Sequence, residues 1–152
     1  MSTTRVNYDL VVQELTCNLF PLDHTVVHAC NMSLAHRLLA FRTVRFGAGR
    51  QQGITEWLAD DFVRNEGHSL VLQTSTELRA DLRYRILAKS NEAKVDSGMF
   101  LAKDIPDHVK HLKFNRVYID DAGHYFNLFK LSKVYDHLAT CTTDDVIIYH
   151  LN

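Results

Sequence analysis

The stretch Thr25-Val-Val-His-Ala-Cys30, followed by Asn31-Met-Ser33 and a run that ends at Phe46-Gly47, decides the predicted fold. Residues 25–30 are apolar and β-branched, which predicts a buried strand. Ser33 is a favourable N-cap, and apolar residues recur after it at helical spacing, which predicts a helix that ends at Gly47. Ligands of open α/β sheets bind where such a strand passes into a helix. We therefore expect any ligand site to lie here.

Composition bounds the class of protein. The 152 residues carry a formal net charge of −1 and fit a single domain, 1–152, with a substantial core. A charge this close to zero argues against nucleic acid or a membrane surface as the main partner. We find no signal peptide and no membrane-spanning run, and Cys17, Cys30 and Cys141 follow no disulfide or metal spacing. We expect an intracellular protein, cytoplasmic or nuclear, with buried reduced thiols and no cofactor.

Hydrophobic periodicity predicts the remaining elements of the first half. We expect strands, helices and one polar connection in the following order: a strand at Tyr8–Leu15, a helix at Ile54–Asn65, a strand at Ser69–Gln73, a polar connection at Thr74–Asp81 and a strand at Leu82–Ala88.

The second half is predicted in the same way: a largely helical segment at Gly98–Leu112, a strand at Arg116–Ile119, a loop at Asp120–His124, a long helix at Tyr125–Ala139 and a closing strand at Asp145–Leu151. Strands that alternate with helices indicate a three-layer α/β/α sandwich. Its sheet is expected to be mixed, largely parallel and six-stranded.

Known phosphate and metal motifs are absent or weak. No Gly-x-x-x-x-Gly-Lys-Ser/Thr occurs, and the Gly-x-Gly within Gly47–Gly53 is expected to follow a helix, which favours a flexible connector over a phosphate cradle. His24, His28 and Cys30 could suggest zinc, but two of them share one predicted strand and no fourth ligand is near. We expect no metal site.

A basic cluster surrounds the first predicted helix. His36, Arg37, Arg42, Arg45 and Arg50 belong to it. The cluster either forms a solvated face or meets a phosphate-bearing ligand or RNA, and the sequence leaves both open.

Two further places carry residues suited to chemistry. Lys89 follows the predicted strand at 82–88, where a half-buried amine with a lowered pKa could act as a nucleophile, although the sequence alone favours a lysine whose ammonium reaches solvent. Asp120-Asp121-Ala122-Gly123-His124 follows the predicted strand at 116–119, where acidic residues can act on a ligand or cap a helix.

In order and spacing, these segments resemble a macrodomain, most closely the terminal ADP-ribose protein glycohydrolase type. The resemblance covers nearly the whole chain. It is sharpest in four segments: Cys17-Asn18-Leu19-Phe20, Leu38 to Gly47 with Ile54-Thr-Glu-Trp-Leu58, Arg83-Tyr-Arg-Ile-Leu-Ala-Lys89, and Leu138 to Leu151.

The resemblance implies hydrolysis of ADP-ribose from acidic side chains of modified proteins. Lys89 would attack the anomeric carbon, and Asp121 or His124 would move protons. Asn18 stands where the family has an aspartate, and the loop before Leu38 lacks the family's glycines. The implied contacts to ADP-ribose are Asn18, Cys30, Asn31, Ser33, Arg37, Ile119, Gly123 and Tyr125.

Two other classes of function stay open. A macrodomain scaffold without ADP-ribose activity could serve as a protein-interaction module, or it could hold another nucleotide or RNA. The enzyme hypothesis depends on Lys89, whereas the interaction hypothesis predicts a partner-binding surface and no response to ADP-ribose. An RNA site predicts binding that weakens steeply with salt.

Overall fold

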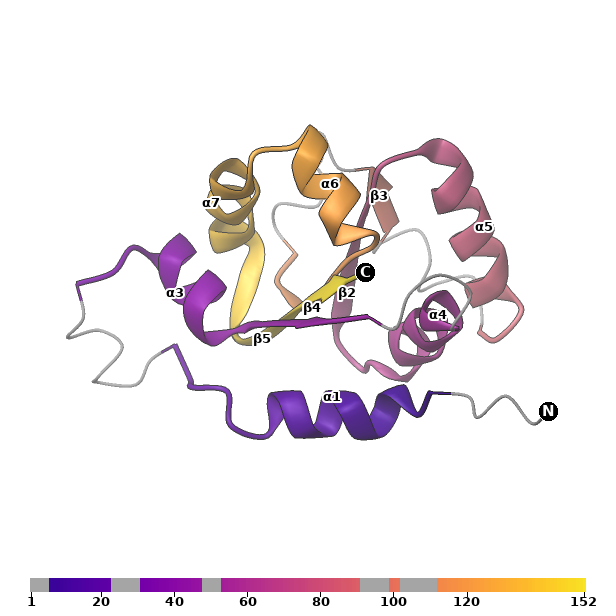
Figure 1. Ribbon diagram of the computed structural model, residues 1–152, viewed down its shortest axis with the longest axis horizontal. Helices are drawn as coiled ribbons and strands as arrows, with labels where there is room; N and C mark the ends of the chain where they lie inside the picture. Colours follow the sequence, from indigo (N-terminus) through magenta and orange to yellow (C-terminus); the bar gives the residue numbers. More distant parts are fainter. Residues whose placement is uncertain (1–5, 23–30, 48–52, 91–98, 102–111) are drawn as a thin grey trace.

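The protein has an α/β fold built on one parallel sheet (Figure 1). The computed structural model describes residues 6–22, 31–47, 53–90, 99–101 and 112–152. Five strands lie in the order β1-β5-β4-β2-β3, and every pair is parallel. Their bounds are Thr43–Phe46 (β1), His68–Gln73 (β2), Met99–Leu101 (β3), Phe114–Ile119 (β4) and Thr142–Leu151 (β5).

Helices cover both faces of this sheet. The described helices are α1 (Tyr8–Thr16), α3 (Leu34–Phe41), α4 (Ile54–Arg64), α5 (Thr76–Leu87), α6 (Ala122–Leu128) and α7 (Leu131–Cys141). Apolar side chains of α3, α6 and α7 form one core with the sheet, and those of α1, α4 and α5 form a second core on the opposite face. The predicted α/β class with helices on both faces is confirmed. The sheet differs from the prediction, because its five strands among the described residues are all parallel.

The strands are buried on both faces, as parallel strands between helical layers must be. In β5, Ile148 belongs to the core under α3 and α7, whereas Tyr149 belongs to the core under α1 and α4. In β2, Leu70 and Val71 divide between the two cores in the same way. Alternate side chains of a strand point to opposite faces, so each strand stabilises both cores.

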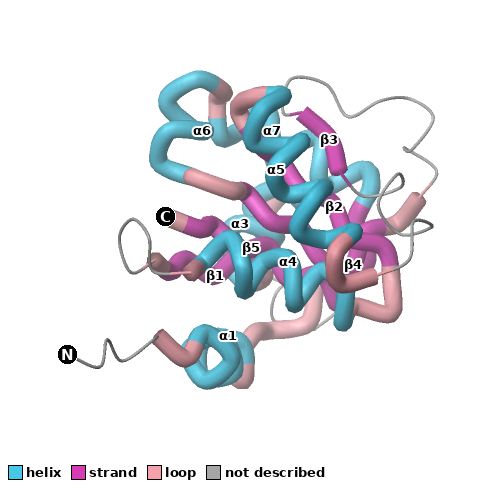
Figure 2. The backbone as a smooth tube through the Cα atoms, turned by 90° about the vertical axis from the view of Figure 1, so that its right-hand side faces the viewer, coloured by secondary structure: helices cyan, strands magenta, loops and turns pink. Residues whose placement is uncertain are grey.

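The order of the strands places the site. The chain passes from β1 through α4 to β2 on one face, and from β4 through α6 and α7 to β5 on the other face (Figure 2). Since all strands are parallel, their carboxyl ends share one edge of the sheet. Crossovers on opposite faces create the crevice in which open α/β sheets bind ligands.

The predicted first strand, Tyr8–Leu15, is wrong: this segment is helix α1. The side chain of Asn7 caps the helix by accepting a hydrogen bond from the N–H of Leu10, at 3.3 Å. Tyr8 and Val12, four residues apart, both pack into the core, whereas Leu10 and Leu15 are exposed. The apolar run therefore has a helical period that its β-branched composition conceals.

The predicted helix from Ser33 to Phe46 is too long. Ser33 caps α3 as expected by accepting from the N–H of His36, but the helix ends at Phe41 and residues 43–46 form strand β1. Val44 pairs with Tyr149 of β5, and this tertiary partner decides the conformation of a short β-branched segment. Consequently the segment Gly47–Gly53 follows a strand and precedes a helix, which contradicts the premise on which the flexible connector was favoured.

The polar connection at 74–81 and the strand at 82–88 are also wrong, because both lie in or beside helix α5. Ser75 caps this helix by accepting from the N–H of Leu78, at 3.2 Å. Leu82 and Ile86 are fully buried one helical turn apart, while Tyr84 between them is 76% exposed. Leu82 and Ile86 are four residues apart, and this spacing places two residues on one face of a strand as well as on one face of a helix. The segment therefore suggested a strand.

Two corrections concern the second half. The predicted helix at 125–139 is two helices, α6 and α7, separated at Phe129 and Lys130, and α6 already begins at Ala122 inside the predicted loop. Residues 99–101 form strand β3 instead of helix. The rest of that predicted helix, 98 and 102–111, lies outside the described residues, as does the predicted strand at 25–30.

The remaining helix and strands predicted within the described residues are confirmed. Helix α4 and strand β2 match the predicted elements almost residue for residue, and the strands predicted at 116–119 and 145–151 lie within β4 and β5. Of the cysteines, Cys141 is buried as expected, but Cys17 is exposed. Cys30 lies outside the described residues.

Candidate functional site

The carboxyl ends of β1 and β4 are joined through Asn152, the residue after β5. Its backbone N–H donates to the carbonyl of Phe46 at 3.1 Å, and its Oδ1 accepts from the N–H of Gly123 at 2.8 Å. Gly47 packs so closely here that a Cβ would lie 2.1 Å from the carbonyl oxygen of Asn152. Only glycine fits this position without movement of the backbone.

The next described residue along the chain, Gly53, starts helix α4. Its φ of 82° lies in the left-handed region, and it offers no side chain to cap the first turn. The N–H groups at the start of an α-helix have no partner within the helix, and together with the helix dipole they favour an anion. Thr55, the second residue of α4, is half-buried and adds a hydroxyl to this end.

Asp120 directly follows β4, on the same edge of the sheet. Its backbone N–H donates to the carbonyl of Leu72 at 3.0 Å, and its Oδ2 accepts from Nε2 of Gln73 at 3.1 Å. Gln73 is the last residue of β2 and is only 2% exposed. Burial raises the pKa of Asp120, and the hydrogen bond from Gln73 acts in the opposite direction. This carboxylate is thus held in place by the strand beside its own.

The start of α4 and the Asp120 carboxylate are complementary in chemistry, because the first favours an anion and the second favours a cation. Only β5 separates β1 from β4, so the two strand ends are about 10 Å apart, which is two strand spacings. A helix start that favours anions and carries the Thr55 hydroxyl, together with the Asp120 carboxylate on the same edge, suits a phosphate chain with a hard divalent cation. Within the described ranges, no group of three or more His, Cys, Asp or Glu side chains could hold a metal on its own.

Part of the predicted site gathers at the turn from β4 into α6. Asp121, with a left-handed φ of 49°, and His124 are exposed there, whereas Tyr125 is buried, which raises the pKa of its hydroxyl. Ile119 ends β4, and the N–H of Gly123 is bound to Asn152.

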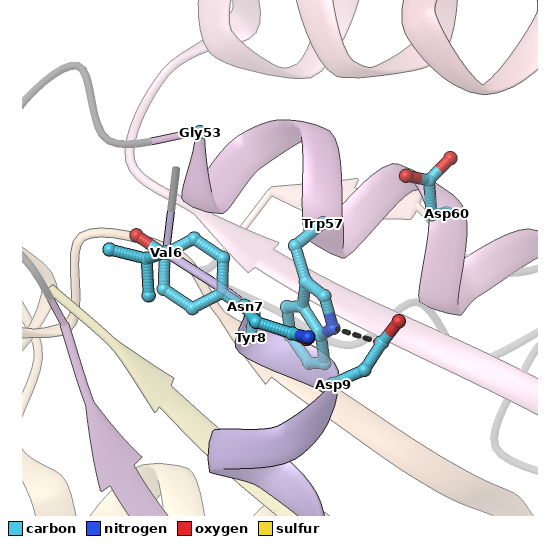
Figure 3. Close-up of a pocket in the computed structure, with 7 residues that line it drawn as sticks. All are labelled: Val6, Asn7, Tyr8, Asp9, Gly53, Trp57 and Asp60. Carbon is cyan, nitrogen blue, oxygen red and sulfur yellow. Dashed lines mark hydrogen bonds between the residues drawn. The ribbon is translucent and has the colours of Figure 1, made fainter. Parts of the chain in front are cut away.

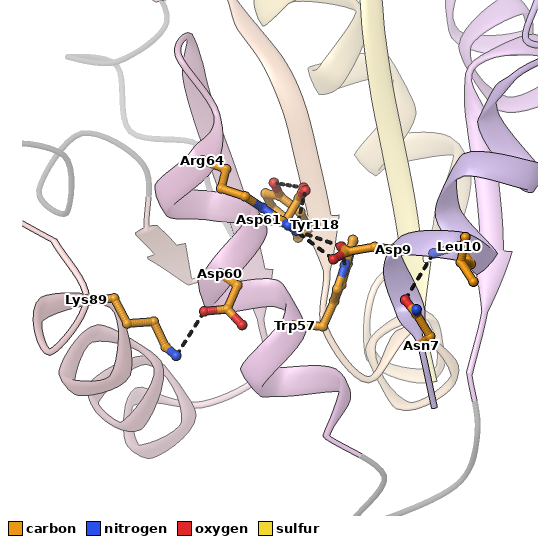
Figure 4. Close-up of polar contacts among 9 residues, drawn as sticks. All are labelled: Asn7, Asp9, Leu10, Trp57, Asp60, Asp61, Arg64, Lys89 and Tyr118. Carbon is orange, nitrogen blue, oxygen red and sulfur yellow. Dashed lines mark hydrogen bonds and ion pairs between the residues drawn. The ribbon is translucent and has the colours of Figure 1, made fainter. Parts of the chain in front are cut away.

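Lys89 lies elsewhere, just after helix α5, and not at the end of a strand. Its ammonium forms an ion pair with Asp60 at 2.9 Å (Figure 4). It forms a second ion pair with Glu56 at 3.2 Å, and both acidic residues lie on α4. Hydrogen bonds to Asp60 and then Glu56 raise the pKa of Lys89. A nucleophilic amine needs a lowered pKa, so this environment stabilises the form of Lys89 that cannot attack a carbon.

The other residues predicted to contact ADP-ribose are not among the residues described above at the carboxyl edge of the sheet. Asn18 is exposed in the turn after helix α1, and Asn31 is exposed with a left-handed φ of 52°. Ser33 caps α3, and Arg37 is half-buried on that helix. Cys30 lies outside the described residues.

Sequence reasoning missed Gly53, Thr55, Gln73 and the anchoring of Asp120. The signal that could have found the first two is the β-branched pair Thr43-Val44 before Gly47, which indicates that the glycine segment follows a strand and precedes a helix. Nothing in the sequence pairs Gln73 with Asp120, because that contact exists only once β2 and β4 are neighbours.

None of the described helices combines the length and the apolar character needed to cross a lipid bilayer. No protein-family model matches the chain, and comparisons with curated proteins and with solved structures likewise find no match.

Proposed function

We propose that this protein binds a nucleoside polyphosphate together with Mg²⁺ at the carboxyl edge of its sheet. The phosphates occupy the start of α4, after β1. Thr55 and Asp120 supply the protein oxygens nearest to the cation. The same two roles occur in P-loop nucleotide sites, where a Ser or Thr at the helix start and an Asp after a second strand hold the metal.

One observation carries the proposal: a segment bounded by Gly47 and Gly53 joins a strand to a helix on the same sheet edge as Asp120, with one strand between. Each part alone is common. A strand joined to a helix by a segment bounded by glycines, beside an acidic strand end at a crossover point of a parallel sheet, is the arrangement that nucleotide sites use.

The residue before Thr55 distinguishes this chain from the usual motif. That position normally holds the lysine that reaches the β- and γ-phosphates, but here it is Ile54. An apolar side chain cannot neutralise the charge that develops on the transferred phosphoryl group. We therefore expect binding of the nucleotide, with hydrolysis that is slow or absent.

The test is a calorimetric titration of the protein with ATP, with and without Mg²⁺. Saturable binding that Mg²⁺ strengthens is expected. Asp120→Asn and Thr55→Val should each remove most of that strengthening, a change of about tenfold or more in affinity for a lost charged contact. Asp144→Asn is the matched control, because this aspartate is exposed near the start of β5, at the opposite edge. An affinity for ATP that changes neither with Mg²⁺ nor in Asp120→Asn would refute the proposal.

ADP-ribose binding is the competing proposal and has the same chemistry at its diphosphate. ADP-ribose should therefore be titrated beside ATP and ADP. A preference for ADP-ribose without any effect of Mg²⁺ would favour the macrodomain hypothesis. Hydrolysis through Lys89 then predicts that Lys89→Ala abolishes the release of ADP-ribose from a modified protein. The ion pairs of Lys89 with α4 count against that chemistry.

A further inference from the structure

A cleft of about 320 Å³ opens between the start of α1 and the first turns of α4 (Figure 3). It is lined from α1 and the residues before it, and from Gly53 and two residues of α4: Val6, Asn7, Tyr8, Asp9, Gly53, Trp57 and Asp60. Gly53 is also the residue at which the proposed phosphate site begins. The cleft is thus adjacent to that site, on the side where α1 covers α4.

The hydroxyl of Tyr8 is the least satisfied group in this cleft. Tyr8 is 5% exposed, and its ring contacts Phe46 and Trp57, with ring centres 6.0 and 6.4 Å away. Its hydroxyl is buried and has no hydrogen-bond partner among the described residues. A buried polar group without a partner is destabilising and rare in native proteins, so this hydroxyl is available to a partner beyond the described residues, such as a bound ligand.

The charged groups of the cleft are paired with cations of the protein, which favours a neutral group as its occupant. Asp9 accepts hydrogen bonds from Nε1 of Trp57 at 3.0 Å and from Nη2 of Arg64 at 2.8 Å (Figure 4). Asp60 is paired with Lys89. Both carboxylates are paired with protein cations or donors, and no Lys or Arg is among the described lining residues, so the cleft offers a phosphate no free cationic partner.

The remaining lining suits a flat, hydrogen-bonding ring. Trp57 and Val6 provide apolar surface, Tyr8 a hydroxyl that can donate or accept, and Asn7 an amide whose oxygen already accepts from Leu10. The exposed lining of the cleft is more polar than apolar, and the cleft volume lies at the lower end of the range of small-molecule sites.

We infer that this cleft binds the base of the nucleotide whose phosphates occupy the start of α4, with the Tyr8 hydroxyl as the group that recognises the base. The inference rests on the proposed function and adds to it. Tyr8 and Trp57 then determine that the ligand is a nucleotide and not a bare polyphosphate.

The chain offers a direct readout, because Trp57 is its only tryptophan and lines the cleft. Mg²⁺-ATP and Mg²⁺-tripolyphosphate are titrated against the wild type while Trp57 emission is followed and calorimetry measures affinity. ATP should change the emission and bind at least tenfold more tightly than tripolyphosphate, which should leave the emission unchanged.

Tyr8→Phe removes one oxygen and keeps the ring. This variant should weaken ATP binding about fivefold and leave tripolyphosphate binding unchanged. Its melting temperature without ligand should be equal to or above that of the wild type, because the unsatisfied hydroxyl is gone. Tyr84→Phe on α5 is the matched control, since that tyrosine is exposed.

The outcomes separate the two claims. If neither ligand binds the wild type, the proposed function and this inference both fail. If both bind with equal affinity, and Tyr8→Phe changes neither, the phosphate site stands and the base cleft is refuted. A loss of ATP affinity confined to Tyr8→Phe, with tripolyphosphate unaffected, supports the inference.

Discussion

The side-chain amide of Gln73 donates a hydrogen bond of 3.1 Å to the carboxylate of Asp120, and this bond links the ends of β2 and β4. The two residues are 47 positions apart in sequence. Gln73 also donates to the carbonyl of Leu78 at the start of α5, so one buried amide orients both the carboxylate and the neighbouring helix. Asp120 is therefore a fixed acceptor at the edge where we propose that Mg²⁺ and phosphates bind.

Loss of this amide should move the pH dependence of ligand binding. Burial raises the pKa of Asp120, and Gln73 opposes that rise. Gln73→Leu should raise the pKa further. Because only the deprotonated carboxylate holds a cation, Mg²⁺-ATP binding should then be lost at a higher pH than in the wild type. Affinity measured between pH 4 and pH 8 tests this, with the exposed Gln13→Leu as control. Coincident midpoints would contradict the role of Gln73.

Asp120→Asn should stabilise the protein without ligand at neutral pH. The pKa of Asp120 is higher in the folded protein than in the unfolded chain, so the carboxylate favours folding most when it is protonated. Asparagine imitates the protonated form at every pH. The melting temperature of the variant should exceed that of the wild type at pH 7, and the gap should close as the pH falls below 4. A variant that melts lower at pH 7 would show that the charge itself stabilises this edge.

His150 should make the fold sensitive to acid. It is buried in β5, its Nε2 lies 2.8 Å from the Tyr135 hydroxyl, and burial lowers its pKa to about 4 from 6.5. The neutral ring therefore stabilises the fold above pH 6.5, and this contribution is lost as the pH falls towards 4. It amounts to at most about 3 kcal/mol.

Unfolding of the wild type and His150→Gln by denaturant, at pH 7 and at pH 4.5, measures how much neutral His150 contributes to the free energy of unfolding. The wild type should lose more stability than the variant on acidification. His137→Gln, an exposed histidine of α7, should behave as the wild type does. An equal loss in the wild type and His150→Gln would contradict the assignment.

Helix α5 can be tested against the strand that its sequence suggests. In a strand, Leu82, Tyr84 and Ile86 would share one face, and truncation of any of them would be destabilising. In the helix, Leu82 is fully buried and Tyr84 is 76% exposed. Leu82→Ala should therefore lower the free energy of unfolding by about 2–5 kcal/mol, and Tyr84→Ala by less than about 0.5 kcal/mol. Similar losses for the two variants would refute the helix.

The sequence alone identifies the elements whose signals are local. Ile54–Asn65 has an apolar face with a helical period, and it is helix α4 in the structure. The apolar runs at 69–73, 116–119 and 145–151 have the continuous hydrophobicity of strands buried on two faces, and all three are strands. These signals were sufficient for the α/β class.

Sequence patterns failed where the period was ambiguous. Residues 8–15 and 82–88 contain alternating or β-branched apolar residues, yet caps at Asn7 and Ser75 and burial at every fourth residue make them helices. In both segments the strand prediction failed, because short apolar runs fit either period. The decisive contacts are with the core beneath them.

Tertiary structure alone decided the candidate site. Thr43–Phe46 is a strand because β5, a hundred residues later, pairs with it, and only this pairing makes Gly47 and Gly53 the bounds of a strand-to-helix connection. Likewise Gln73 meets Asp120 only through the neighbouring positions of β2 and β4. Local patterns determine which segments are helices and strands, whereas the order of strands in a sheet determines which of their ends meet, and that order depends on packing between distant segments.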